Sequence, residues 1–161
     1  MKEIILQTTV KVCRYEELDE EDRFLVDMAR NAAKSSYAPY SRFNVGAAVK
    51  LDWGTIITGS NQENAAYPSG LCAERVALFS AGAQYPARAV DTLVIAARNA
   101  DGELSRPIAP CGACRQVMLE VESRHKRAMR VILFGTDCCY IIEGGAKELL
   151  PLSFDSGFLE G

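Results

Sequence analysis

Hydrophobic positions follow two different periods along this chain, and the change from one to the other predicts its first elements. Residues 4–12 place isoleucine, leucine, threonine and two valines on one face of an extended chain, which predicts a strand. After an acidic stretch at residues 19–22, apolar residues return every three or four positions until about Ser36, which predicts a helix. Acidic residues at this start would stabilise the positive end of the helix dipole.

Further along the chain, short apolar runs predict buried strands and longer segments with helical spacing predict helices. The expected strands are 45–51, 56–59, 93–97, 131–134 and 139–142. The expected helices are 71–83, 112–123 and 146–150. Strands that alternate with helices predict an α/β fold, in which a mixed five-stranded sheet is covered by helices on both faces in three layers. We expect one domain over residues 1–161, with residues 1–13 as an additional N-terminal strand.

Charge and composition exclude several classes of partner. The chain has 161 residues, the usual size of one domain, and a net charge of −3 from 18 basic and 21 acidic residues. It therefore lacks the positive field that drives binding to nucleic acids or anionic membranes. Its apolar runs are too short for a membrane helix, and the N-terminal run is too short for a signal peptide. We expect a cytoplasmic protein whose six cysteines are thiols or metal ligands.

Two cysteine motifs lie where a loop is expected to enter a helix. The first is Cys-Ala-Glu at 72–74 and the second is Pro-Cys-Gly-Ala-Cys at 110–114. A helix N-terminus lowers a thiol pKa and favours the thiolate, which is the metal-binding form. Three thiolates, from Cys72, Cys111 and Cys114, suit one zinc ion and leave its fourth position open to water, as is typical of a catalytic site.

The residues beside these ligands have chemistry that a hydrolytic zinc site needs. Glu74 is the predicted general acid–base. The chain contains a single histidine, which nearly excludes a histidine as the base. Because residues two apart on a helix do not share a face, Cys72 is expected at the helix entry rather than within the helix. A zinc ion with three thiolates carries a net charge of −1, and Arg75 and Arg115 are hypothesised to balance it.

Two other interpretations of the cysteines stay open. A Cys-x-x-Cys pair is also typical of redox pairs and of structural zinc sites, which need a fourth ligand. Cys13, Cys138 and Cys139 are the remaining thiols, but their spacing is not that of paired zinc ligands. The combination of Cys-x-Glu with Pro-Cys-x-x-Cys favours a catalytic zinc site, because it matches the signature of zinc deaminases with cysteine as first ligand.

The chain resembles the small homotetrameric cytidine deaminases over roughly residues 37–154. The matching segments are Tyr-Ala-Pro-Tyr-Ser at 37–41, Phe-Asn-Val-Gly-Ala-Ala at 43–48, Asn-Gln-Glu-Asn-Ala-Ala-Tyr-Pro at 61–68, Cys-Ala-Glu-Arg at 72–75, Pro-Cys-Gly-Ala-Cys-Arg-Gln at 110–116 and Leu-Leu-Pro at 149–151. The resemblance implies hydrolytic deamination of cytidine and deoxycytidine to uridine and deoxyuridine, with release of ammonia. It also implies one zinc ion per subunit, a homotetramer, and a Glu74 that passes a proton from water to N3 and then to the departing amino group.

The same resemblance assigns contacts to the substrate. Asn61 and Glu63 would hold the ribose 3′-hydroxyl, Phe43 would pack near the pyrimidine, and the main chain at Ala73 would bind the base oxygen. Phe154 would reach the site of a neighbouring subunit. The carboxylate of Glu63 should repel a phosphate, which favours a free nucleoside as substrate. The alternatives are that Asn61 and Glu63 are turn residues and that Phe43 is a core residue.

Three rival functions follow from the same residues. A deaminase of a nucleoside antibiotic such as blasticidin S would share the zinc motifs, but those relatives lack the blocks at 43–48 and 61–66. A zinc-stabilised binding module would have a closed site with four ligands. A deaminase that edits RNA or DNA would need a basic channel. The basic run at 124–130 is interpreted instead as the solvated end of a helix, where cations complement the dipole.

Overall fold

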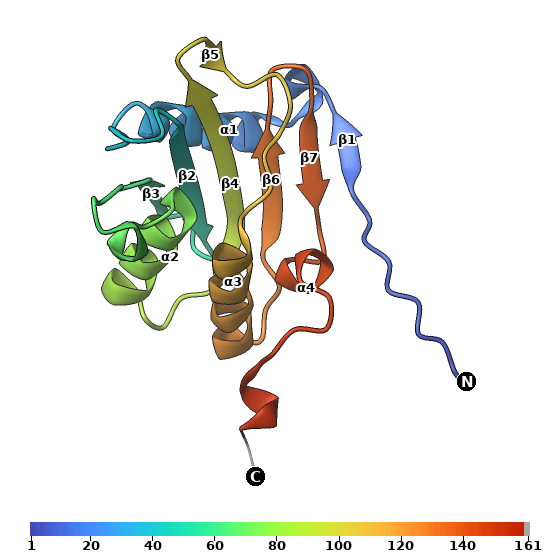
Figure 1. Cartoon of the computed structure of the whole chain (residues 1–161). Coiled ribbons are helices and arrows are strands. Elements are labelled where there is room, and N and C mark those ends of the chain that lie inside the picture. The colour runs from blue at the N-terminus through green and yellow to red at the C-terminus, as the bar shows by residue number, and fades with distance from the viewer. Residues whose placement is uncertain (160–161) are drawn as a thin grey trace.

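A computed structural model of the protein describes residues 1–159 and is built around one seven-stranded mixed sheet (Figure 1). The strands are β1 (Lys11–Cys13), β2 (Asn44–Leu51), β3 (Ile56–Ser60), β4 (Val90–Asn99), β5 (Gly102–Glu103), β6 (Arg130–Phe134) and β7 (Cys139–Ile142). Their order is β1-β7-β6-β4-β2-β3, with β5 paired to β4 beside this path. Only the β4–β6 pair is parallel among these strands.

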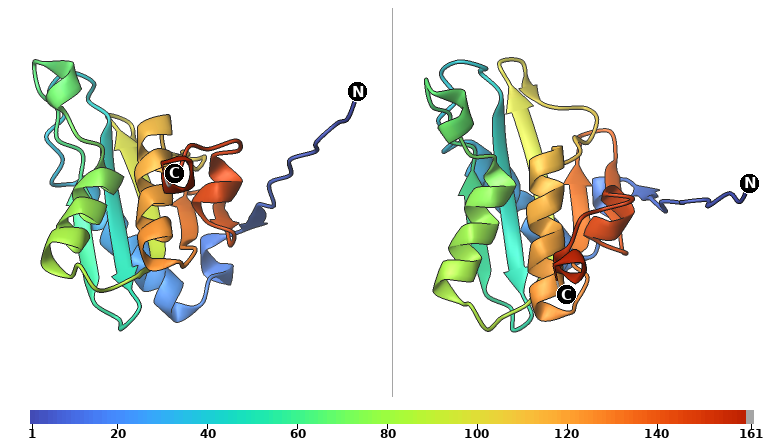
Figure 2. Two further views of the ribbon diagram at one scale, coloured as in Figure 1. Left: turned by 90° about the horizontal axis from the view of Figure 1, so that it is seen from below. Right: turned by 60° about the horizontal axis from the view of Figure 1, so that its bottom comes forward.

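Helices cover both faces of the sheet, which confirms the predicted α/β class. The helices are α1 (Glu20–Ala33), α2 (Ala73–Gln84), α3 (Gly112–His125) and α4 (Ala146–Leu149). Helix α1 lies on one face, and α2, α3 and α4 lie on the other (Figures 1 and 2). The predicted five strands are joined by β1, which lies within the additional N-terminal strand predicted over residues 1–13, and by the two-residue β5, which was not predicted. Within residues 1–159, no helix combines the length and apolar character that crossing a bilayer requires.

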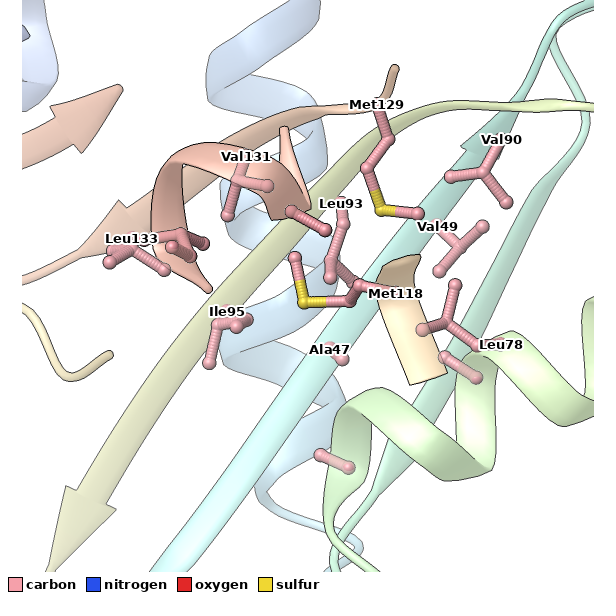
Figure 3. Close-up of a cluster of buried hydrophobic side chains, with 14 of the residues drawn as sticks. Ala47, Val49, Leu78, Val90, Leu93, Ile95, Met118, Met129, Val131 and Leu133 are labelled. Carbon is pink, nitrogen blue, oxygen red and sulfur yellow. The ribbon is translucent and has the colours of Figure 1, made fainter. Parts of the chain in front are cut away.

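Alternation along β2 distributes its side chains between the two layers. Val45, Ala47 and Val49 join the larger core under α2 and α3, and Ala48 joins the smaller core under α1. Figure 3 shows the larger core, in which Leu78 of α2 and Met118 of α3 meet the side chains of the central strands. Because α2 and α3 pack on the same core, the sheet holds them side by side, and the residues at their N-termini are brought together (Figure 2).

Helix α1 begins and ends for local reasons. The Asp19 side chain caps its first turn by accepting a hydrogen bond from the Asp22 backbone N–H at 2.8 Å. Its apolar stripe is buried, and its backbone lies so close to β2 that a methyl group on Gly46 would fall 2.0 Å from the carbonyl oxygen of Ala29. The helix ends at Ala33, three residues before the predicted end at Ser36.

The basic run at 124–130 is only partly the solvated helix end that the sequence predicts. Arg124 and His125 do lie in the last turn of α3. Arg130, however, begins β6 and donates to both carboxylate oxygens of the buried Asp22, at 2.5 and 2.7 Å. Arg127 pairs with Asp91. The interpretation was wrong for Arg130, because its partner is distant in sequence and a local charge pattern does not reveal it. Arg127 directly follows the helix C-cap Lys126 and its side chain is 47% exposed, so it does lie at the solvated end.

The strand predicted over residues 4–12 was also largely wrong. Only Lys11–Cys13 pairs, and its partner is β7, which is four residues long. Residues 1–10 are exposed, Ile4 to 80%, and the N-terminal end points away from the body (Figure 1), while the Thr8 hydroxyl donates to the carbonyl oxygen of Glu148 at 2.6 Å. Alternation gives a segment the propensity for a strand, but a strand also needs a neighbouring backbone for its hydrogen bonds, and β7 is too short to supply it. That residues 1–161 form one domain stays a prediction.

Candidate active site

Three cysteines meet where two helices begin on the same face of the sheet. Cys72 is the N-cap residue of α2, Cys111 is the N-cap residue of α3, and Cys114 lies in the first turn of α3. The three Sγ atoms all lie within 4.8 Å of one another. Cys72 therefore enters its helix as a cap, as the spacing between Cys72 and Glu74 predicts.

The distances between the sulfurs fit a single zinc ion. A tetrahedral ion with Zn–S bonds of ~2.3 Å separates its ligands by about 3.8 Å. The Sγ atoms of Cys72 and Cys111 are 3.8 Å apart, and those of Cys111 and Cys114 are 3.4 Å apart. Within residues 1–159, no fourth Cys, His, Asp or Glu ligand atom joins this group. The donor set thus has the three ligands of a catalytic site rather than the four of a structural one.

The remaining cysteines do not belong to this group. Cys13 lies on β1 opposite Cys139 on β7, at the edge of the sheet away from β2 and β3, on which α2 packs. Cys139 is buried and Cys138 is partly exposed, so the neighbouring pair divides between interior and surface. This placement removes them as candidates for a fourth ligand.

One of the two predicted arginines contacts the sulfurs, and the other does not. Arg75 Nη2 donates to the Sγ of Cys72 at 3.6 Å. The pKa of Cys72 is lowered to about 5, chiefly by the neighbouring Cys114 thiol, with a further contribution from Arg75. The pKa of Cys114 is raised by the neighbouring Cys72 sulfur and by burial. Arg115 does not take the predicted role, because its guanidinium donates to the carbonyl oxygens of Pro110 and Leu149.

Glu74 lies beside the sulfurs in a nearly dry environment. It is the second residue of α2, and only 4% of it is exposed to solvent. Burial raises the pKa of its carboxyl group above the ordinary value, and the neighbouring Cys72 sulfur adds to this effect. A carboxyl group with a raised pKa can both accept and return a proton, which is what a general acid–base must do.

A cavity of about 750 Å³ lies in front of Glu74 and the sulfurs. This volume is within the range that small-molecule sites occupy. The cavity is lined by the residues predicted to hold the substrate, Phe43, Asn61 and Glu63, together with Cys72, Glu74, Arg75 and Cys111. Residues that are distant in sequence are thus collected at one cavity, as a ligand-binding site requires.

Asn61 and Glu63 also hold the rim of this cavity together. The Asn61 amide accepts from the backbone N–H of Val45 at 2.7 Å and donates to the carbonyl of Phe43 at 2.9 Å. Glu63 accepts from the backbone N–H of Tyr40 at 2.8 Å and from the hydroxyl of Ser41. The hydrogen bond from Ser41 lowers the pKa of Glu63, so its carboxylate is charged at neutral pH.

Two predicted site residues, Ala73 and Phe154, are not part of the cavity lining. Ala73 is fully buried as the first residue of α2, where helix geometry leaves the backbone N–H without an intrahelical acceptor. Phe154 is 58% exposed on the C-terminal segment, outside the cavity lining, and its ring stacks on Phe158 with centroids 5.6 Å apart. Within one chain, Phe154 therefore has no contact with the cavity.

The sequence interpretation missed several residues of the cavity wall. These are Tyr40, Ser41, Gln62, Asn64, Tyr67, Leu71, Ile108 and Ala109, together with Val45 and Gly70. The rings of Tyr40 and Tyr67 meet edge to face, with centroids 5.9 Å apart, and join two loops of the rim. A signal was present, since both tyrosines lie in the matched blocks at 37–41 and 61–68, and Ile108 and Ala109 directly precede the second cysteine motif.

Comparison with known proteins gives consistent matches. A profile described as the cytidine and deoxycytidylate deaminase zinc-binding region matches residues 19–130, which contain the three cysteines and Glu74. A cytidine deaminase of Halalkalibacterium halodurans is 44% identical over 132 residues, 82% of this chain and 92% of that protein. A crystal structure of cytidine deaminase from Burkholderia pseudomallei overlaps with a TM-score of 0.69 at 38% identity, and covers 85% of this chain and 100% of that one. A blasticidin-S deaminase of Bacillus cereus is 26% identical over 147 residues, 85% of this chain and 94% of that protein.

Proposed function

The chain belongs to the family of cytidine and deoxycytidylate deaminases, and from this we propose that it is a zinc-dependent enzyme that converts cytidine and deoxycytidine to uridine and deoxyuridine with release of ammonia. One observation carries this proposal. A three-sulfur site with an open position, a buried carboxyl group beside it and a nucleoside-sized cavity in front of both occur together.

Cys72, Cys111 and Cys114 would hold the zinc ion, one per chain. When bound, zinc would supply Lewis acidity that lowers the pKa of water and makes hydroxide available near neutral pH. The two helix N-termini and Arg75 supply positive charge around the three thiolates, so that the site can carry its excess negative charge.

Glu74 would move the protons of the reaction. Its carboxylate accepts a proton from water and delivers it to N3 of the pyrimidine, while the hydroxide that remains adds to C4. It then accepts the proton of the new C4 hydroxyl and gives it to the amino nitrogen, so that the C4–N bond breaks, ammonia leaves and the C4 carbonyl of the uridine forms. Burial favours this cycle because a carboxyl group with a raised pKa holds a proton more readily than an exposed carboxyl group does, and can pass it on to the substrate. A nearly dry environment also strengthens its electrostatic interaction with the substrate.

Asn61, Glu63 and Phe43 would orient the nucleoside, with Phe43 against the base and the two polar residues at the ribose 3′-hydroxyl. The negative charge of Glu63 would disfavour a phosphate at this end of the cavity, so we propose free nucleosides as substrates. The backbone N–H of Ala73 would bind the base oxygen. Its place in the first helical turn supports this role.

We further propose that the enzyme is a cytoplasmic homotetramer. Phe154 supports this, because its exposed ring lies outside the cavity of its own chain and could contribute to the site of a neighbouring subunit. Light scattering of the purified protein tests the assembly directly, and a stable monomer would contradict it.

The decisive assay follows the loss of cytidine absorbance while zinc is measured in the same sample. We expect turnover of cytidine and deoxycytidine in proportion to bound zinc, loss of turnover on chelation, and recovery on addition of zinc. Blasticidin S serves as the competing substrate. Turnover of blasticidin S but not of cytidine would overturn the proposed substrate, and full zinc loading without turnover of either compound would favour a binding module.

A further inference from the structure

The geometry points to Arg115 as a positioning residue, which braces the zinc-ligand loop against α4, and we propose that it sets the metal affinity of the site. Arg115 directly follows the ligand Cys114 in α3. Its guanidinium turns away from the sulfurs, and donates from Nε to the carbonyl of Pro110 at 2.8 Å and from Nη1 to the carbonyl of Leu149 at 2.6 Å. The inference rests on the proposed zinc site.

The first acceptor fixes the approach to a metal ligand. Pro110 is buried and immediately precedes Cys111, so its carbonyl group belongs to the loop that carries the Cys111 sulfur. Proline has no backbone N–H, so a hydrogen bond to its carbonyl group is the backbone hydrogen bond available at this residue. Holding this carbonyl group restricts the direction from which the chain enters α3 at Cys111.

The second acceptor connects that loop to a fixed point. Leu149 is the last residue of α4, where helix geometry leaves carbonyl groups without intrahelical donors. The other end of α4 is held by Glu122, which accepts from the backbone N–H groups of Ala146 at 2.9 Å and Met129 at 3.0 Å. Because Glu122 of α3 holds the first residue of α4 independently of Arg115, α4 offers Arg115 a fixed support.

A planar guanidinium suits this task better than an ammonium group does. It presents its N–H donors in a fixed fork, so that two acceptors are held at a defined separation. The difference between the two groups separates a positioning role from a charge-balancing role. If only the positive charge of Arg115 mattered, Arg115→Lys would bind zinc like the natural protein. If the two hydrogen bonds matter, Arg115→Lys would bind zinc as weakly as Arg115→Met, because one ammonium group cannot hold both acceptors as the guanidinium does.

The test measures zinc affinity by competition between the loaded protein and a chelator, well below the melting temperature. Supporting residues of metal sites typically change affinity by about 10- to 100-fold, and we expect Arg115→Met to weaken zinc binding within this range. Arg115→Lys should recover at most a small part of the loss. Arg124→Met is the matched control, since Arg124 lies in the last turn of the same helix, and it should bind zinc like the natural protein.

A second readout follows the ligand geometry itself. With cobalt(II) in place of zinc, Arg115→Met should change the thiolate-to-metal absorption bands, and Arg124→Met should not. Unchanged affinity and spectra in Arg115→Met, even with a lower melting temperature, would overturn the inference, because they would show a role in stability alone. Natural affinity in Arg115→Lys would overturn it in favour of charge balance. A natural protein that binds no zinc would overturn both this inference and the proposed function, whereas a zinc-loaded, active protein that is indifferent to Arg115 would overturn only the inference.

Discussion

The guanidinium of Arg75 lies 3.6 Å from the Sγ of Cys72, the residue that caps the same helix. This is the single direct contact between a basic side chain and a proposed zinc ligand among the hydrogen bonds of residues 1–159. It raises the pKa of Arg75, because the sulfur accepts its hydrogen bond. Three thiolates around a divalent ion leave one excess negative charge, and we propose that Arg75 compensates it through this contact with one ligand.

Arg75→Gln should therefore lower turnover while zinc stays bound. Removing the positive charge leaves more negative charge on the sulfurs, which makes the ion a weaker Lewis acid. A hydrogen bond to a charged group contributes roughly 1.5–3 kcal/mol, so a decrease in kcat of about 10- to 100-fold is expected. Steady-state kinetics with metal analysis of the same sample measure it, and unchanged turnover would show that Arg75 does not balance the site.

Glu74→Gln should abolish almost all turnover without loss of zinc. Glutamine keeps the size of the side chain but cannot accept a proton from water, and acid–base groups contribute about 10²- to 10⁴-fold to rate. The loss should be at least this large, because Glu74 handles more than one proton transfer. Zinc content and melting temperature, measured on the same preparation, separate a chemical defect from a folding defect. Near-normal turnover by Glu74→Gln would contradict the proposed mechanism.

The zinc ligands and Glu74 could be predicted from the sequence because each of them lies in a motif that can be recognised locally. Cys72, Cys111 and Cys114 all sit at helix starts, and a helix start is recognisable from a few neighbouring residues. Once helical spacing places α2 and α3, the sulfurs and Glu74 have little freedom. The central strands could also be predicted locally, because the boundaries of their apolar runs differ by only a few residues from the boundaries of the observed strands.

The errors concern contacts between residues that are distant in sequence. The position of Arg115 beside a ligand suggested charge balance, but its second acceptor, Leu149, lies 34 residues further along the chain. Residues 4–10 have the alternation of a strand, but whether they pair depends on the length of β7, more than a hundred residues later. Local patterns report propensity, and these outcomes are decided by the partners that the fold supplies.

Glu63 gives a prediction about substrate choice. Its carboxylate is charged at neutral pH, and it lies on the cavity wall beside the proposed ribose end. Cytidine should therefore be turned over far better than cytidine 5′-monophosphate. Glu63→Gln should raise KM for cytidine, because it removes a carboxylate proposed to hold the ribose. It should also reduce the ratio of kcat/KM for cytidine to kcat/KM for cytidine 5′-monophosphate, because it removes the charge that repels a phosphate. Equal turnover of both compounds by the natural protein would contradict this account.

Gly59 links the sheet to the helix that carries Glu74. A methyl group at Gly59 on β3 would fall 2.6 Å from the backbone N of Ala77 and 2.7 Å from the carbonyl oxygen of Ala73, so α2 would have to move away. Overpacking of this kind typically costs about 1–3 kcal/mol, and Gly59→Ala should lower the free energy of unfolding by this amount. Because α2 bears Cys72 and Glu74, turnover should fall as well. Gly82→Ala is the control for added bulk in the same helix, since the atom that a methyl group would meet there is the end of the flexible Arg124 side chain, at an ordinary contact distance of 3.6 Å, and it should not lower the free energy of unfolding.

Glu122 should make stability depend on pH in a direction opposite to that of most carboxylates. It is buried in α3, and burial raises its pKa above 4.5, although the backbone N–H groups of Met129 and Ala146 oppose this shift. A carboxyl group whose pKa is higher in the folded state favours folding below its unfolded pKa, and this contribution is lost as pH rises through the folded pKa. The charged carboxyl group of Glu122 therefore lowers the free energy of unfolding at neutral pH, and this effect is absent near pH 4, where the group is protonated.

Glu122→Gln removes the titration and keeps the acceptor, since an amide oxygen can accept from the same two N–H groups. We expect the variant to be more stable than the natural protein at pH 7 to 8, with a difference that shrinks towards zero as pH falls to about 4. Denaturant unfolding at four values between pH 4 and 8 measures this difference, and comparison at each pH cancels the effects of zinc release that both chains share. Glu120→Gln, on the exposed side of the same helix, is the control, and its difference in free energy of unfolding from the natural protein should hardly change with pH. A Glu122→Gln variant that is less stable at pH 7 would show that the charged carboxylate is bound by its two donors more strongly than burial disfavours it.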